Sequence, residues 1–378
     1  MSLKSAIVSR AASYLTSEAA LTKRRRDAEK ARQRSGDPHR VDAFIDPADP
    51  YSHLLLQLLP ALADRYTIEL THWLVGPPED AAAPDRPRLA SWSQRDAAIL
   101  AARAGLSPDS VPLPAALDGA DIDAGNARRT ACGHYLGGVL HYGGETYWGI
   151  DRLHYLEARL TALGLRRDGG DAPLYAPPPD IAGPVATPSP KTIHWYLSFR
   201  SPYTWLSAPR IAALAAAHGA TLELRFVLPM VMRSLPVPAE KRRYITFDTA
   251  REARRLGIPF GKVADPVGRP VERGYALLPW ARAQGRGAEF ATAFLRAVFS
   301  QGIDAGSDTG MQRIVTAAGL DWKEAHSIID NDDWRAEAEA NRAELLDLGL
   351  WGVPSFRVGD DAVWGQDRLW AVDAMLRG

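Results

Sequence analysis

The chain of 378 residues repeats one pattern of strands and helices on either side of a proline-rich stretch. This stretch, residues 166–190, holds seven prolines and shows no amphipathic period, which is typical of a semi-extended linker. The half before it opens with VDAFIDPADPYSHLLL and closes with VLHYGGETYWGIDRL, and the half after it opens with IHWYLSFRSPYTWLS and closes with SFRVGDDAVWGQDRL. Each opening predicts a strand, a turn and a helix, and each closing predicts a hairpin and a last helix.

A repeat of this length predicts duplicated domains rather than a solenoid. A strand and helix, then a helical insertion, then two strands and a helix describe a thioredoxin-type α/β fold. We therefore expect two tandem thioredoxin-like domains, each with a helical insertion, the second complete and the first reduced. The expected divisions are 1–40 for an N-terminal helical extension, 41–165 for the reduced domain, 166–190 for the linker and 191–378 for the complete domain, with its insertion at about 230–345.

Charge and hydropathy narrow the class of partner. Lysine and arginine number 45, as do aspartate and glutamate, so no net field favours nucleic acid or an acidic membrane, and a small molecule is the expected partner. No apolar run reaches the roughly 18 residues of a membrane span. Charged residues interrupt the N-terminus, which lacks the apolar centre of a signal peptide. A cytoplasmic location is expected.

The single cysteine, Cys132, excludes an intramolecular disulfide and a Cys-x-x-Cys redox pair. A buried apolar thiol is the expected state of this side chain. A dithiol oxidoreductase is therefore excluded, and no set of metal ligands is identified.

Three motifs of the second half could carry chemistry. Ser201 and Pro202 suit the cap and first position of a helix. If the Val353–Pro354 bond is cis, Val353 would offer its backbone N–H and C=O to an extended ligand. Asp367, in WGQDRL, either caps the last helix or receives a ligand ammonium group.

Nearly the whole of residues 191–378 resembles the 2-hydroxychromene-2-carboxylate isomerases and the kappa-class glutathione transferases, the cysteine-free branch of the DsbA-like thioredoxin folds. The resemblance rests on four motifs in the same order: SPYTWL, KRRYITFDTAREARRLGIPF, GVPSF and WGQDRL.

The resemblance implies glutathione as cofactor and Ser201 as the catalytic hydroxyl that binds its thiolate. It also implies that Val353 and Pro354 pair with the peptide backbone of glutathione, and that Gln366 and Asp367 hold its γ-glutamyl end. Tyr203, Lys241 and Tyr244 are the implied substrate contacts. For the last two, a solvated lysine and a packed tyrosine are the alternative.

One part of the family pattern is missing. Members usually carry an asparagine in a TGN turn ahead of the KRRY segment, whereas this chain reads PMVMRSLPVPAEKRRY, with Arg233 and Ser234 but no asparagine. Glutathione contacts or substrate choice are expected to differ there. Related single-domain members tend to be dimers, so the chain is expected either to pair its two domains internally or to form a homodimer.

The first half keeps the helix cap but loses the other features. Counting back from YWGIDRL and VWGQDRL places Gly138 opposite Pro354, and the stretch DPYSHL places Asp49 opposite Ser201. A carboxylate caps a helix well, but it would repel a thiolate held close to it. We interpret the first half as degenerate.

Two hypotheses remain. The first is an enzyme that uses a glutathione thiolate on an aromatic or unsaturated molecule, either as an isomerase or as a transferase. The second is a non-catalytic tandem thioredoxin-fold protein that binds or scaffolds a partner, in which case Ser201→Ala would change no activity.

Overall fold

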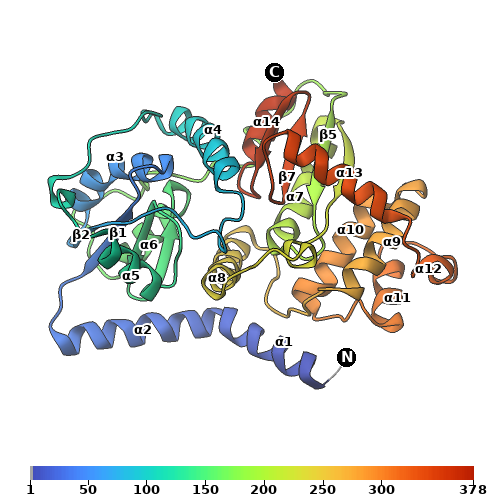
Figure 1. Cartoon of the computed structure of the whole chain (residues 1–378), viewed down its shortest axis with the longest axis horizontal. Helices are drawn as coiled ribbons and strands as arrows, with labels where there is room; N and C mark the ends of the chain where they lie inside the picture. The colour runs from blue at the N-terminus through green and yellow to red at the C-terminus, as the bar shows by residue number, and fades with distance from the viewer. Residues whose placement is uncertain (1–2) are drawn as a thin grey trace. The chain divides into compact units, whose positions relative to one another are not determined.

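The computed structural model describes residues 3–378 and divides them into two compact units (Figure 1). The first unit comprises Leu21–Pro177 together with the short segment Pro236–Tyr244. The second unit comprises the N-terminal segment up to Ala20, Pro178–Leu235 and Ile245–Gly378. The main division at Pro177 falls inside the proline-rich stretch, but each unit also takes a segment from the other side of it.

The first unit is built on a mixed four-stranded sheet with the strand order β2-β1-β3-β4. β1 pairs in parallel with β2 and antiparallel with β3, and β3 and β4 form a hairpin. The interior of β1 is buried, as the apolar run after Arg40 predicts. The elements of this unit are α2 (Glu18–Ser35), β1 (Arg40–Ile45), α3 (Pro50–Arg65), β2 (Glu69–Leu74), α4 (Arg86–Ala104), α5 (Ile122–Ala131), β3 (Val139–Tyr142), β4 (Glu145–Trp148) and α6 (Leu153–Ala162).

The second unit has a sheet with the corresponding order, β6-β5-β7-β8, and the same parallel and antiparallel pairs. Its helical insertion runs from α8 to α13. The elements are α1 (Leu3–Thr16), β5 (Thr192–Leu197), α7 (Pro202–His218), β6 (Thr221–Phe226), α8 (Ala239–Leu256), α9 (Arg269–Ala283), α10 (Gly287–Arg296), α11 (Asp308–Ala317), α12 (Trp322–Ile328), α13 (Trp334–Asp347), β7 (Ser355–Val358), β8 (Asp361–Trp364) and α14 (Leu369–Arg377).

The two sheets also share their local contacts. The N–H of Val75 donates to the carbonyl of Ile45 in the first unit, and Val227 donates to Leu197 in the second, at 2.9 and 3.0 Å. These bonds continue the parallel pairing beyond the strand ends. The repeat that the sequence predicts is therefore present as two mixed α/β sheets of one topology.

An aromatic cluster fills the second unit beside the end of β5. Phe199 stacks on Phe294 and on Tyr275, with ring centroids 4.1 and 5.1 Å apart. All three side chains are buried. The cluster fastens the inserted helices α9 and α10 to the turn that leads into α7.

Within residues 3–378, no helix has the length and apolar content needed to cross a membrane.

Candidate active site

Ser201 caps the N-terminus of α7, as the sequence predicts. Its Oγ accepts a hydrogen bond from the N–H of Thr204 at 3.2 Å, and Pro202 occupies the first helical position. Proline costs nothing there because the first N–H groups of a helix have no partner within the helix. Ser201 as a whole is partly exposed.

The loop before β7 brings a second polar group to Ser201. The Val353–Pro354 bond is cis, and the carbonyl of Val353 accepts a hydrogen bond from the Ser201 hydroxyl at 3.2 Å. The N–H of Val353 has no hydrogen-bond partner within the described residues 3–378. The serine hydroxyl therefore contacts a residue whose backbone N–H is unpaired, in the loop that leads into β7. This arrangement can receive an extended peptide and an anion.

Gly352 allows this loop to approach the β7–β8 hairpin closely. A Cβ at Gly352 would lie 1.9 Å from the Trp364 ring, so no larger residue fits without displacement of the loop or the ring. The carbonyl of Pro354 accepts a hydrogen bond from the N–H of Gly365 at 2.9 Å, which fixes the other side of the turn.

Tyr275 supports the turn from behind, and sequence reasoning missed it. Its hydroxyl donates to the carbonyl of Val227 at 2.6 Å and accepts from the N–H of Phe199 at 3.4 Å. Burial raises the pKa of Tyr275 far above its usual range, so the phenol stays neutral. The sequence offered only an apolar helical segment around it, and the contact depends on the tertiary fold. Tyr275 is a positioning residue.

Two charged or polar neighbours of Ser201 are already paired. Arg200 forms a bidentate ion pair with Asp265, with distances of 2.7 and 2.8 Å, so its cation is largely neutralised. The hydroxyl of Tyr203 donates to the buried Asp248 at 2.9 Å. Tyr203 was predicted as a substrate contact. It is the second residue of α7, and its bond to Asp248 connects it to α8.

Gln366, predicted to help hold the γ-glutamyl end of glutathione, has protein partners for its side chain in this structure. Its side chain is buried, its Nε2 donates to Glu252 at 2.9 Å, and its Oε1 accepts from Arg210. Because both ends of the amide have protein partners, Gln366 positions the segment after β8. Asp367 remains partly exposed and lies 3.4 Å from the Arg368 guanidinium. It does not cap α14, whose cap residue is Arg368.

Lys241 and Tyr244 are packed within the first unit and do not show the solvated lysine of the alternative interpretation. Lys241 is buried and donates to the carbonyl of Ala82 at 2.7 Å. Burial lowers its pKa to about 8. The Tyr244 ring packs edge-on against His134, with centroids 4.5 Å apart. Within the first unit, Lys241 and Tyr244 thus contact Ala82 and His134.

The turn that lacks the family asparagine has a distinctive backbone. Ser234 adopts a left-handed conformation with φ of 58°, a region in which asparagine is enriched and serine is uncommon. The Nε of Arg233, the residue before it, is buried without a hydrogen-bond partner within the described chain. The turn therefore holds a left-handed residue, Ser234, without an asparagine.

The first unit repeats the geometry of the turn but not its chemistry. Asp49 caps α3 and accepts from the N–H of Ser52 at 3.0 Å, as Ser201 does from Thr204. The carbonyl of Gly138 accepts from the N–H of Gly149 at 2.8 Å, as Pro354 does from Gly365. These bonds confirm the alignment of Gly138 with Pro354. A carboxylate now stands where the second unit has a hydroxyl.

Burial, followed by the neighbouring Asp46 carboxylate, raises the pKa of Asp49 to about 6, although hydrogen bonds from Ser52 oppose the shift. An acid whose folded-state pKa lies above its unfolded value of about 3.9 binds more protons when folded, so stability falls as the pH rises from about 4 to 6. Asp49→Asn keeps the cap and removes this loss. We expect the variant to exceed the wild type by at most about 3 kcal/mol in free energy of unfolding at pH 8, and to match it at pH 4.

Urea unfolding at the two pH values measures this difference. Ser307→Ala, at the cap of α11, is the control and should change the free energy of unfolding equally at both, because a serine hydroxyl does not ionise in this range. An Asp49→Asn effect that is the same at pH 4 and pH 8 would contradict the raised pKa.

A groove of about 920 Å³ on the second unit does not include Ser201. Its walls come from α7, α10 and α11, and alanines form much of its surface, with Glu289, Arg296 and Arg313 among the charged residues. Large pockets are the usual first choice for a ligand site. Neither Ser201 nor Val353 lines this groove. Because these two residues carry the hydroxyl donor and the unpaired N–H, we place the candidate site at Ser201.

The second half of the chain carries a DSBA-like thioredoxin domain. The model of that family, described as the DSBA-like thioredoxin domain, matches residues 192–377, which span β5 to α14. The β6-β5-β7-β8 sheet, the capped α7 and the cis-proline loop all lie within this match.

Within this class, the chain is similar to 2-hydroxychromene-2-carboxylate isomerases. It is 23% identical to the enzyme of Sphingobium xenophagum over 197 residues, and 21% identical to that of Pseudomonas putida over 192 residues. These matches cover 98% and 93% of the relatives but only 49% of this chain. A solved 2-hydroxychromene-2-carboxylate isomerase shares 21% identity and a TM-score of 0.43, covering 49% of this chain and 94% of that one. The cytosolic disulfide reductase DsbM from Pseudomonas aeruginosa, solved with GSH, has 21% identity and a TM-score of 0.39, covering 49% of this chain and 96% of its own.

Proposed function

We propose that the second unit is a glutathione-dependent enzyme that acts on an aromatic or unsaturated small molecule through a thiolate bound at Ser201. One observation carries the proposal: at the N-terminus of α7 the Ser201 hydroxyl contacts the carbonyl of Val353, a residue whose own N–H has no hydrogen-bond partner within residues 3–378. The relatives named 2-hydroxychromene-2-carboxylate isomerase match the same half of the chain and support an isomerase.

The proposed role of Ser201 is to stabilise the thiolate form of glutathione. When glutathione binds, the hydroxyl turns from the Val353 carbonyl to the sulfur and donates a hydrogen bond to the thiolate, keeping its own proton. A hydrogen bond to a charged group contributes about 1.5–3 kcal/mol, and a helix N-terminus adds about 0.3–1 kcal/mol. Together these terms lower the pKa of the thiol by roughly 1–3 units, which places it near neutrality.

In the isomerase reaction, the thiolate adds to a carbon of the conjugated system and its electron pair moves into the substrate. The former double bond becomes single and rotates, and the thiolate then leaves with the same electron pair. No atom is gained or lost, so glutathione is a cofactor. In a transferase reaction the sulfur–carbon bond would persist and the substrate would lose its own leaving group.

Glutathione itself tests the proposal. Isothermal titration of the full chain with reduced glutathione is expected to give one site, and S-methylglutathione, which cannot form a thiolate, should bind more weakly. The proposal would be contradicted if glutathione gave no heat of binding and also left the melting temperature unchanged in a thermal-shift assay.

A non-catalytic binding or scaffold role is the second candidate. It is favoured by Asp49 and Gly138, which show that one copy of the turn persists without the proposed chemistry. We also propose that the two units are tandem thioredoxin-like domains, since their sheets have one topology. If the chain is a scaffold, Ser201→Ala should leave every measured binding affinity unchanged.

A further inference from the structure

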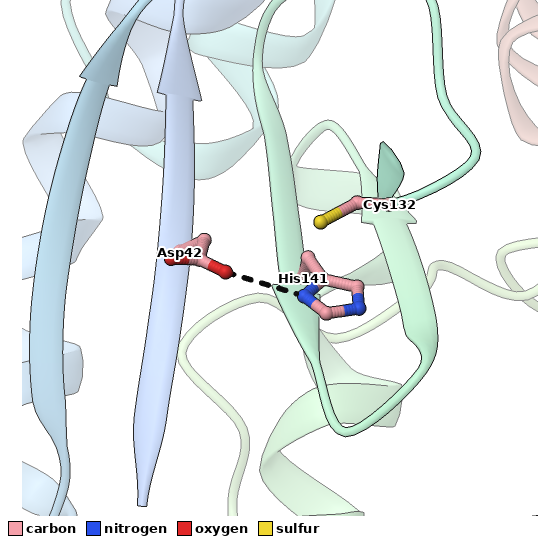
Figure 2. A group of neighbouring side chains, drawn as sticks. All are labelled: Asp42, Cys132 and His141. Carbon is pink, nitrogen blue, oxygen red and sulfur yellow. Dashed lines mark hydrogen bonds and ion pairs between the residues drawn. The ribbon is translucent and has the colours of Figure 1, made fainter. Parts of the chain in front are cut away.

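Three side chains with different metal-binding chemistry meet in the first unit (Figure 2). Asp42 lies in β1, Cys132 ends α5, and His141 lies in β3. One ligand atom of each lies within 4.8 Å of the others. Because about 90 residues of chain separate Asp42 from Cys132, only the folded unit brings the three together.

The spacing is close to that of a tetrahedral metal centre. Zinc bonds of roughly 2.0–2.3 Å place neighbouring ligand atoms about 3.3–3.8 Å apart. Asp42 Oδ2 and His141 Nδ1 are already 3.4 Å apart. The Cys132 sulfur lies within 4.8 Å of the other two ligand atoms, at most about an ångström beyond the upper end of that range.

We propose that Asp42, Cys132 and His141 form a three-ligand site for a divalent transition-metal ion of the zinc type, with the fourth position left to water or an outside ligand. A thiolate, an imidazole and a carboxylate are each ordinary zinc ligands, and three protein ligands with one open position are typical of reactive rather than purely structural zinc sites. This site is independent of glutathione binding at Ser201.

Burial and hydrogen bonding prepare the carboxylate and leave the site accessible. The Asp42 side chain is only 3% exposed, whereas that of His141 is 15% exposed and Cys132 is partly exposed. Trp73 Nε1 donates to Asp42 Oδ1 at 2.9 Å, which holds the carboxylate in place and leaves Oδ2 facing His141. Such outer contacts orient the ligands of metal sites.

Arg128 competes with a metal ion for the same oxygen. Its Nη2 donates to Asp42 Oδ2 at 2.7 Å, and 43% of its side chain is exposed. The guanidinium can swing into solvent when a cation arrives, but its charge opposes that cation. Removal of Arg128 should therefore strengthen metal binding. If Asp42 instead serves only to pair with Arg128, the same removal gives no gain in metal binding.

His141 must also change one contact. The N–H of Gly144 points at His141 Nε2 at 3.2 Å, so Nε2 is the bare nitrogen and the proton sits on Nδ1. A metal bound through Nδ1 moves that proton to Nε2, and the Gly144 N–H must then turn towards water. Gly144 lies in the exposed turn between β3 and β4, where such a change is local.

Cobalt(II) is the decisive probe, because a cobalt–thiolate bond absorbs in the near ultraviolet and Cys132 is the single cysteine of the chain. The untagged full-length protein under reducing, chelator-free conditions is expected to show this absorption with one equivalent of Co²⁺, and to lose it when Zn²⁺ is added. Zinc titration calorimetry should give one site. No thiolate absorption at stoichiometric Co²⁺ would overturn the proposal.

Single substitutions separate a three-ligand site from metal caught on the thiol alone. His141→Gln and Asp42→Asn should each weaken Zn²⁺ binding at least roughly tenfold, and Cys132→Ser should abolish the thiolate absorption. If the absorption and the affinity survive in both His141→Gln and Asp42→Asn, the site is wrong. Circular dichroism checks that each variant is folded. If Asp42→Asn does not fold, the result for His141→Gln alone decides whether the three-ligand site exists.

Arg128→Ala gives a test that runs in the opposite direction. It should raise the affinity for Zn²⁺ by at least about fivefold, because one nearby positive charge is removed. Arg40→Ala is the matched control, since Arg40 lies on the same strand and pairs with Glu69 at an exposed position. An Arg128→Ala variant that binds Zn²⁺ less tightly than the wild type would also overturn the proposal.

Discussion

Ser201→Ala is expected to reduce glutathione-dependent turnover by about 10- to 100-fold at neutral pH. Loss of the hydroxyl removes about 1.5–3 kcal/mol of thiolate stabilisation, so the pKa of the bound thiol rises by roughly 1–2 units and the thiolate fraction falls accordingly. The ultraviolet absorbance of the bound thiolate, followed against pH, measures the pKa directly. Isomerisation of 2-hydroxychromene-2-carboxylate and conjugation of a generic aryl halide measure turnover.

The controls separate chemistry from helix capping. Ser307 caps α11 through the N–H of Gly310 at 3.1 Å, so Ser307→Ala should cost about 1 kcal/mol of stability without a change in turnover. Ser201→Thr keeps a hydroxyl and should retain most activity. Ser201→Asp reproduces the cap of the first unit, and its carboxylate should block binding of the thiolate. Full activity in Ser201→Ala would remove this residue from the mechanism.

Gly352→Ala is expected to destabilise the protein by at least about 2 kcal/mol and to abolish glutathione binding. The added Cβ would lie 1.9 Å from the Trp364 ring, which itself packs edge-on against Trp351. Either the ring or the loop must move, and the loop carries the Val353 N–H and the carbonyl beside Ser201. Urea unfolding and glutathione titration measure the two losses.

A double-mutant cycle identifies the contact responsible for this loss. Trp364→Leu makes room for the added methyl group, so its combination with Gly352→Ala should cost less than the sum of the single variants. Gly359→Ala is the control: this glycine has φ of 60° and open space around it, so its substitution should cost stability but not glutathione affinity. If the effects of the two substitutions simply add, the Trp364 ring is not the group that excludes a side chain at position 352.

Local sequence rules predicted the helix cap at Ser201 and the position of the closing hairpins. Serine before proline specified the cap of α7, and the aligned hairpins correctly paired Gly138 with Pro354. These features depend on a few neighbouring residues with strong conformational preferences. The cis state of Val353–Pro354 was only a conditional expectation, because its base rate is low without tertiary context.

The rest depends on contacts between distant segments. Nothing near Lys241 in the sequence shows that it donates to Ala82, and nothing near Gln366 shows that Arg210 and Glu252 occupy its amide. The expectation for Cys132, a buried apolar thiol, was incomplete for the same reason: it is half-buried beside a carboxylate and an imidazole from two strands. Helical and strand periodicity carries no information about such neighbours.

The exchange of segments across the proline-rich stretch bears on how the chain can have evolved. Thr16 of α1 accepts a hydrogen bond from Arg254 at 2.9 Å, and Lys241 supplies the first unit with its bond to Ala82. A gene fragment that encoded either half alone would leave one unit without its borrowed segment and with apolar side chains such as Tyr244 bared. A break or recombination at the proline-rich stretch would therefore remove part of both units, so the two halves of the chain have to be inherited together.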